Sequence, residues 1–130
     1  MQKGIHYIFL ADSTGIASVF PTLKERLATA MYQHVTLFYC AGNNQFTFQK
    51  ELEILQKHFP IQLVVGYYSK ARSRNCVFQQ EDIEVIINAN TMQQMRFIIS
   101  GNNEFVAQIT DCLTFLGIED IQIHEQFFSE

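Results

Sequence analysis

The chain has 130 residues, of which 48% are hydrophobic and 17% charged, so we expect one domain spanning 1–130 with a substantial core. Its formal net charge of −4 disfavours a nucleic-acid binder, and no apolar run approaches the length of a membrane span. Its 3 cysteines are widely spaced, which predicts reduced thiols in a cytoplasmic protein, and no closely paired ligands predict a metal site.

The first predicted unit is a strand, a polar turn and a helix. Residues 5–11 are almost continuously apolar, as in a strand covered on both faces of a parallel sheet. After the turn, a helical apolar pattern starts at Ile16, and because Pro21 belongs in a first turn we expect the regular helix to begin near Ser18, as its N-cap. Such a turn gathers backbone N–H groups and the positive end of a helix dipole, which suits a phosphate. The alternative is a buried turn that binds nothing.

Two further strands are predicted in the first half of the chain. Residues 34–41 form a β-rich apolar run, and a helix is expected over 47–58, ended by Pro60. Residues 61–67 form the third predicted strand. The polar, basic stretch 68–80 that follows is predicted to be a loop.

The second half of the chain continues the alternation. Residues 81–88 alternate like a strand, but their acidic start favours a helix, and the alternation of strands and helices elsewhere decides for the helix. A strand over 96–100 precedes a helix that ends at Gly117, which sits where a C′ glycine belongs. The last predicted strand lies within 118–128, with Ile121 and Ile123 facing the core.

Five strands alternating with helices predict a three-layer α/β/α sandwich with a parallel sheet. Ligands of such open sheets bind beyond the carboxyl ends of the strands. Three polar turns are expected to meet there, at 12–15, 67–74 and 100–103. The histidines lack a Ser or Cys partner in sequence, so no catalytic residue is predicted.

Several segments together resemble the NAD(P)-binding domain of the ferredoxin–NADP reductase superfamily. They match that family's order of motifs, and they are Ala11 to Ser18, Phe48 to Glu53, Ser69-Lys70, Ser100 to Asn102, Leu116 to Ile118 and Ile123 to Phe127. The resemblance implies a five-stranded parallel sheet of order 3-2-1-4-5. It also implies a nicotinamide-nucleotide-binding module of a flavin-dependent oxidoreductase that transfers electrons.

The resemblance also implies where a dinucleotide would lie. The cofactor-binding residues it implies are Asp12, Ser13, Thr14, Gly15 and Ile16 for the pyrophosphate, Ser69, Lys70 and Arg72 for the adenosine phosphate, and Ser100, Gly101 and Asn102 for the nicotinamide. NADP is favoured over NAD, because the loop after the third strand carries three cations and no acid. FAD is expected only through a partner or missing domain, since no flavin-binding barrel precedes this one.

Five positions depart from the family's pattern. Asp12 and Ser13 replace glycines or small residues, Ser18 replaces a first-turn proline, Ser100 replaces a cysteine near the nicotinamide, and Asn102 replaces a proline. Asp12, Ser100 and the expected lack of a flavin-binding barrel motivate an alternative: a degenerate, non-catalytic relative that acts as a protein-interaction module. A flavodoxin-like or receiver-like domain is a third reading, and its strand order would be 2-1-3-4-5.

Overall fold

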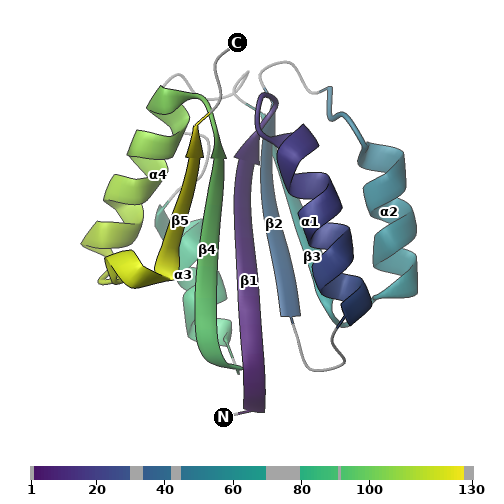
Figure 1. Ribbon diagram of the computed structural model, residues 1–130, viewed down its shortest axis with the longest axis horizontal. Helices are drawn as coiled ribbons and strands as arrows, with labels where there is room; N and C mark the ends of the chain where they lie inside the picture. The colour runs from purple at the N-terminus through teal and green to yellow at the C-terminus, as the bar shows by residue number, and fades with distance from the viewer. Residues whose placement is uncertain (1, 30–33, 42–44, 70–79, 91, 128–130) are drawn as a thin grey trace.

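The computed structural model describes residues 2–29, 34–41, 45–69, 80–90 and 92–127, and these form a sheet with helices on both faces (Figure 1). Five parallel strands lie in the order β3-β2-β1-β4-β5, which confirms the predicted fold and excludes the order 2-1-3-4-5. The strands are β1 (Gln2–Asp12), β2 (His34–Ala41), β3 (Leu63–Ser69), β4 (Met92–Gly101) and β5 (Ile123–Phe127).

Two pairs of helices cover the two faces of the sheet. These are α1 (Ile16–Thr29) and α2 (Gln49–His58) on one face, and α3 (Gln80–Ala89) and α4 (Asn103–Phe115) on the other. Alternate residues of β1 divide between the two cores: Phe9 packs on the α1 side, and Leu10 packs on the α4 side. A strand buried on both faces reads as a continuous apolar run, which is why 5–11 could be recognised from sequence.

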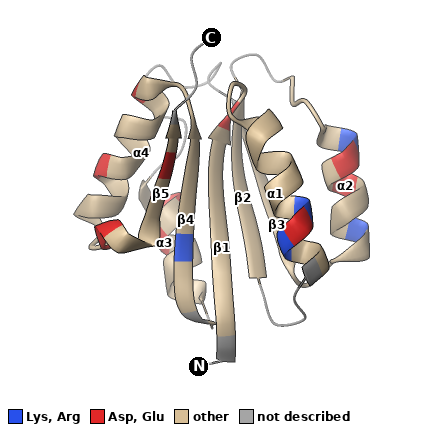
Figure 2. Ribbon diagram, in the orientation of Figure 1, with Lys and Arg blue, Asp and Glu red and all other residues tan. Residues whose placement is uncertain are grey.

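The register fixes what meets at the carboxyl ends of the central strands. Asp12 pairs with Cys40 of β2, and Ala11 pairs with Ser100 of β4. The turns that follow β1 and β4 therefore leave the sheet at the same height, side by side. Figure 2 shows the acidic segment at the carboxyl end of β1, where Asp12 lies.

The helix α1 begins two residues earlier than predicted, at Ile16, so Ser18 lies inside it and is not its N-cap. Pro21 has no N–H to donate to the carbonyl of Ala17, four residues earlier. The helix interior accommodates it because both residues are exposed to solvent. The helix predicted over 81–88 is confirmed as α3. The αL conformation of Phe48, at φ 69°, sets the start of α2 at Gln49.

Two strand predictions were placed too early in the chain. The third strand begins at Leu63, and Ile61 before it is 83% exposed in a turn after α2. Ile121, predicted to face the core, is 80% exposed in a 3₁₀ turn, η2 (Asp120–Gln122), and β5 begins at Ile123. An isoleucine beside a helix end carries the same local signal as one in a strand, so pattern alone misplaced both. Gly117 has the φ of +89° expected of a C′ glycine.

Candidate functional site

The turns after β1 and β4 meet around one buried carboxylate, that of Asp12, which is 4% exposed. Its Oδ1 accepts hydrogen bonds from the N–H of Thr14 at 2.9 Å, the hydroxyl of Thr14 at 2.6 Å and the N–H of Gly15 at 2.9 Å. Its Oδ2 accepts from the N–H of Asn102 at 3.1 Å. One side chain therefore holds together two turns that are 90 residues apart in sequence.

Two glycines allow this close approach. A Cβ on Gly101 would lie 2.6 Å from the carboxylate of Asp12, and a Cβ on Gly15 would lie 2.0 Å from the carbonyl oxygen of Ser100. The hydroxyl of Ser100, which is fully buried, donates to the carbonyl of Gly15 at 3.3 Å. The turns are thus packed backbone against backbone, and the side chain of Asp12 bonds to both of them.

Asn102 has two functions in this arrangement. Its side chain is the N-cap of α4, where Oδ1 accepts the N–H of Phe105 at 2.8 Å. Its backbone N–H donates to Asp12, which a proline at this position cannot do because proline has no N–H. The two departures from the family's pattern, Asp12 and Asn102, therefore complement each other.

Six of the predicted site residues come together here: Asp12, Thr14, Gly15, Ser100, Gly101 and Asn102. Ser13 is exposed in the turn, and Ile16 is buried as the first residue of α1. Ser69 is the last residue of β3, two strands away from β1. Lys70 and Arg72 lie outside the described residues, as do Cys76 and Phe128.

The carboxyl half of β3 contributes an unpaired polar group that the sequence analysis did not single out. The Tyr67 hydroxyl is buried and has no hydrogen-bond partner among the described residues. It stands in an aromatic cluster with Tyr39 and Phe46, and burial raises the pKa of both tyrosines. The sequence signal for this buried hydroxyl is weak: Tyr67 is a tyrosine two residues before the end of a strand.

Two negative observations apply to the described part of the chain. No helix there is both long and apolar enough to cross a bilayer. Among the same residues, no group of three or more His, Cys, Asp and Glu side chains is arranged to hold a metal ion.

Comparison with known proteins was informative only for three-dimensional structure. No protein-family model and no curated protein sequence matches the chain. Solved structures match over nearly its whole length. The ferredoxin-NADP+ reductase of Plasmodium falciparum matches with a TM-score of 0.71 and 20% identity, over 95% of this chain and 52% of the reductase.

Two other structures show the same likeness. The CS-b5R domains of human Ncb5or, in their NAD+ form, match with a TM-score of 0.77 and 16% identity, over 92% of this chain and 36% of that one. The flavohem-like FAD/NAD-binding domain of a nitric oxide dioxygenase from Vibrio cholerae O1 biovar El Tor matches with a TM-score of 0.63 and 15% identity, over 95% and 51%. The chain spans about half the length of the reductase, and about a third of the length of the human protein. It therefore has the α/β fold of the ferredoxin–NADP+ reductase-like proteins, as the sequence resemblance predicted.

Proposed function

We propose that this chain is a nicotinamide-nucleotide-binding module of a flavin-dependent oxidoreductase. The observation that carries the proposal is the meeting of the β1 and β4 turns at the carboxyl edge, in a fold whose solved examples include a ferredoxin-NADP+ reductase and an NAD+-bound protein. Parallel sheets bind their ligands at that edge, where the strand order reverses. A flavin-binding domain, supplied by another chain or another part of the protein, would take the hydride, and this domain would orient the nicotinamide.

In this proposal the dinucleotide lies across the carboxyl ends of β3, β2, β1 and β4. Its pyrophosphate lies against residues 12–16, its nicotinamide against 100–102, and its adenosine phosphate against Ser69, Lys70 and Arg72. Two of the N–H donors, those of Thr14 and Gly15, are already bonded to Asp12. Binding must therefore displace that carboxylate or rely on the remaining first-turn N–H groups of α1, and we expect weak affinity.

The cofactor preferred is NADP, because Lys70 and Arg72 belong to a stretch of sequence after β3 that carries three cations and no acid over 70–74. Each charge-assisted hydrogen bond to a 2′-phosphate is worth roughly 1.5–3 kcal/mol, or about 10- to 150-fold in affinity. The double variant Lys70→Glu, Arg72→Glu is expected to abolish or reverse the NADPH preference, measured by calorimetric titration with NADPH and NADH. An unchanged ratio of the two affinities would remove Ser69, Lys70 and Arg72 from the adenosine site.

A second candidate function is favoured by the position of the Asp12 carboxylate. This side chain accepts the N–H groups that an anionic ligand would need, those of Thr14 and Gly15, and it also accepts the Asn102 N–H. A domain whose phosphate donors are satisfied internally suits a non-catalytic relative that binds proteins instead of nucleotides.

Titration of the wild-type chain and of Asp12→Gly with NADPH separates the two candidates. Heat of binding with the wild type, retained or increased in Asp12→Gly, supports the nucleotide-binding module. Binding by Asp12→Gly alone means that the carboxylate blocks the site, which supports the interaction module. If a folded Asp12→Gly also fails to bind at millimolar NADPH, the nucleotide-binding proposal is wrong. Circular dichroism of each variant shows whether it is folded.

A further inference from the structure

A groove on the α1 side of the sheet lies outside the site described above. Helices α1 and α2 pack over the half of the sheet formed by β1, β2 and β3, and no described helix covers β4 and β5 on that face (Figure 1). Parallel sheets are normally covered on both faces. The space between α1 and β5 is a cavity of about 340 Å³, at the lower end of the sizes that hold small ligands. We call it the α1–β5 groove.

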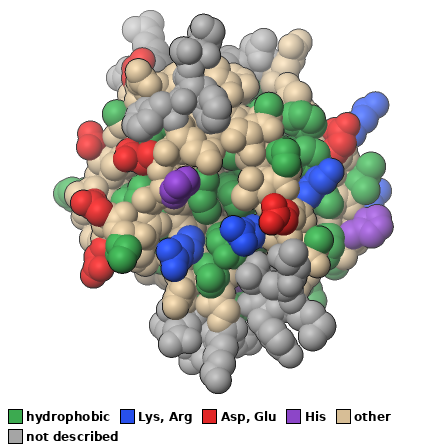
Figure 3. All heavy atoms as spheres, viewed as in Figure 1, with side chains coloured by type: hydrophobic (Ala, Val, Ile, Leu, Met, Phe, Trp, Pro, Cys, Tyr) green, Lys and Arg blue, Asp and Glu red, His purple; other side chains and the backbone are tan. Residues whose placement is uncertain are grey.

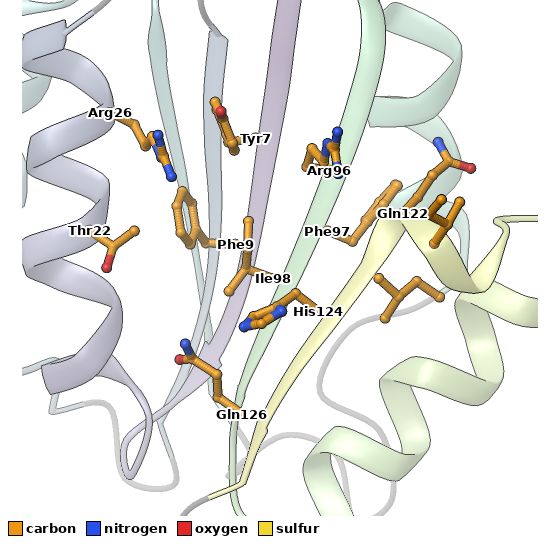
Figure 4. A pocket seen from close by; sticks show the side chains of 12 residues that line it. Tyr7, Phe9, Thr22, Arg26, Arg96, Phe97, Ile98, Gln122, His124 and Gln126 are labelled. Carbon is orange, nitrogen blue, oxygen red and sulfur yellow. The ribbon is translucent and has the colours of Figure 1, made fainter.

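One end of the α1–β5 groove is cationic. Arg26 of α1 and Arg96 of β4 stand on either side of Tyr7, which pairs with Arg96 across the two strands (Figure 4). The Arg26 guanidinium lies 4.9 Å from the centre of the Tyr7 ring, which holds the planar group in a fixed orientation. Arg96 makes no hydrogen bond or ion pair with any described residue, and its side chain is exposed on this face.

The rest of the α1–β5 groove is apolar along its floor and neutral at its far end. Phe9 of β1 and Ile98 of β4 are register partners on the floor, and His124 of β5 stands beside Ile98. The hydroxyl of Ser18 donates to Oε1 of Gln126 at 3.1 Å, which links α1 to β5 at this end. Figure 3 shows basic, acidic and histidine side chains around hydrophobic ones on this face of the molecule.

Charge makes the α1–β5 groove different from the rest of the molecule. The whole chain has a formal net charge of −4, yet none of the described residues that line the groove is an aspartate or glutamate. Its shape and chemistry therefore suit a molecule with an anionic group at one end and a flat apolar body. Thr22 and Gln126 supply neutral hydrogen-bonding groups around that body.

We infer that the α1–β5 groove binds a small aromatic anion, such as a ring that carries a phosphate. The anionic group lies between Arg26 and Arg96, and the ring lies along the apolar floor toward His124. This site lies on a face of the sheet, and so it is separate from the dinucleotide site proposed at the carboxyl edge. The inference does not depend on dinucleotide binding.

Two pairs of probes test the inference on the full chain. Flavin mononucleotide is compared with riboflavin by fluorescence titration, and AMP is compared with adenosine by calorimetry, so each pair differs only in the phosphate. At least one phosphorylated probe is expected to bind about tenfold or more tightly than its partner, since charge-assisted hydrogen bonds contribute that much. The pair that shows the preference identifies the ring. If neither phosphorylated probe binds at millimolar concentration, the inference fails.

A matched pair of charge variants locates the binding. Arg96→Gln is expected to remove most of the phosphate preference, and Lys50→Gln, which removes an exposed cation from α2, is expected to leave it intact. Equal losses in both variants would mean a general charge effect and would overturn the assignment. NADPH affinity is measured in the same variants. If Arg96→Gln weakens NADPH and the phosphorylated probe in parallel, the groove is part of the dinucleotide site and no second site exists.

Discussion

The turn at Asp12 and the α1–β5 groove are built on the same two strands, β1 and β4, but they satisfy their polar groups in opposite ways. At the carboxyl end, every oxygen of the buried carboxylate accepts a protein donor. Farther down the same strands, Arg96 extends from the sheet into a cavity that no carboxylate lines among the described residues. Both oxygens of the Asp12 carboxylate have partners within the protein, whereas Arg96 has none among the described residues.

This difference shows that a strand–turn–helix motif can be recognised in the sequence, but the motif does not reveal whether its backbone N–H groups are available to a ligand. Backbone N–H groups at a helix start attract any anion, and an aspartate of the protein is one. Substitutions in the two regions test whether the turn is structural and the groove is a surface for binding.

The largest effect is expected for Gly15→Ala, which places a methyl group 2.0 Å from the carbonyl oxygen of Ser100. Neither backbone can move without separating β1 from β4, so we expect a loss of roughly 3 kcal/mol in the free energy of unfolding. Urea denaturation measures it. Gly117→Ala serves as the control, because it meets no atom within 4 Å and is strained only by its φ of +89°. A smaller cost at Gly15 than at Gly117 would show that the turn is not closely packed.

Asp12→Ala is expected to cost about 2 kcal/mol of stability, because it leaves the N–H groups of Thr14, Gly15 and Asn102 without their acceptor. With its carbonyl oxygen facing the turn, Asp12→Asn still accepts the N–H groups of Thr14 and Gly15, but it presents an NH₂ group to the N–H of Asn102. Its cost should therefore be smaller, about 1 kcal/mol. Thermal unfolding of both variants ranks them. Equal stability of the wild type and Asp12→Ala would mean that the carboxylate does not hold the turns together.

The same turn shows how far sequence reasoning reached. The strand, the turn and the helix were recognisable because a buried parallel strand reads as an apolar run, and the polar residues 12–15 end that run. The bond from Asn102 to Asp12 was not, because it depends on the register of β1 against β4, which residues 90 positions apart do not encode locally. Arg26 and Arg96 were overlooked for the same reason. Each is an ordinary charged residue in its own element, and only the fold places them around Tyr7.

An intermediate, pH-dependent effect is expected at the amino-terminal half of β1. His6 is buried between Asn90 at 3.1 Å and Thr36 at 2.8 Å. Burial, above all, lowers its pKa below 6.5. Below pH 6.5 the unfolded chain therefore binds a proton at His6 more readily than the folded chain does. The contribution of His6 to the free energy of unfolding is fully present above pH 6.5 and decreases as the pH drops below it.

The stability difference between the wild type and His6→Gln, measured by urea denaturation from pH 7.5 to pH 5, should therefore change with pH. Its slope cannot exceed about 1.4 kcal/mol per pH unit, which corresponds to one proton. A His6→Gln curve parallel to the wild type would show that His6 is not buried in its neutral form.

The smallest effect is expected for Arg96→Gln, whose free energy of unfolding should stay within about 0.5 kcal/mol of the wild type. Its side chain is exposed and has no bond to a described residue that the substitution would break. The same denaturation assay measures this. A large loss of stability would make Arg96 a structural residue, and the contrast between the turn and the groove would disappear.

The place of β1 has a consequence for how the chain acquires its structure during synthesis. It is made before the other four strands of the described sheet and is the central one, and its neighbour β4 begins 90 residues after it, with Gln2 paired to Met92. Until β4 emerges, one edge of β1 and part of its apolar surface have no partner. Pairings so distant in sequence close large loops and slow folding. A nascent chain stopped before Met92 would therefore expose an unpaired edge of an apolar strand, and chaperones would be expected to bind it there.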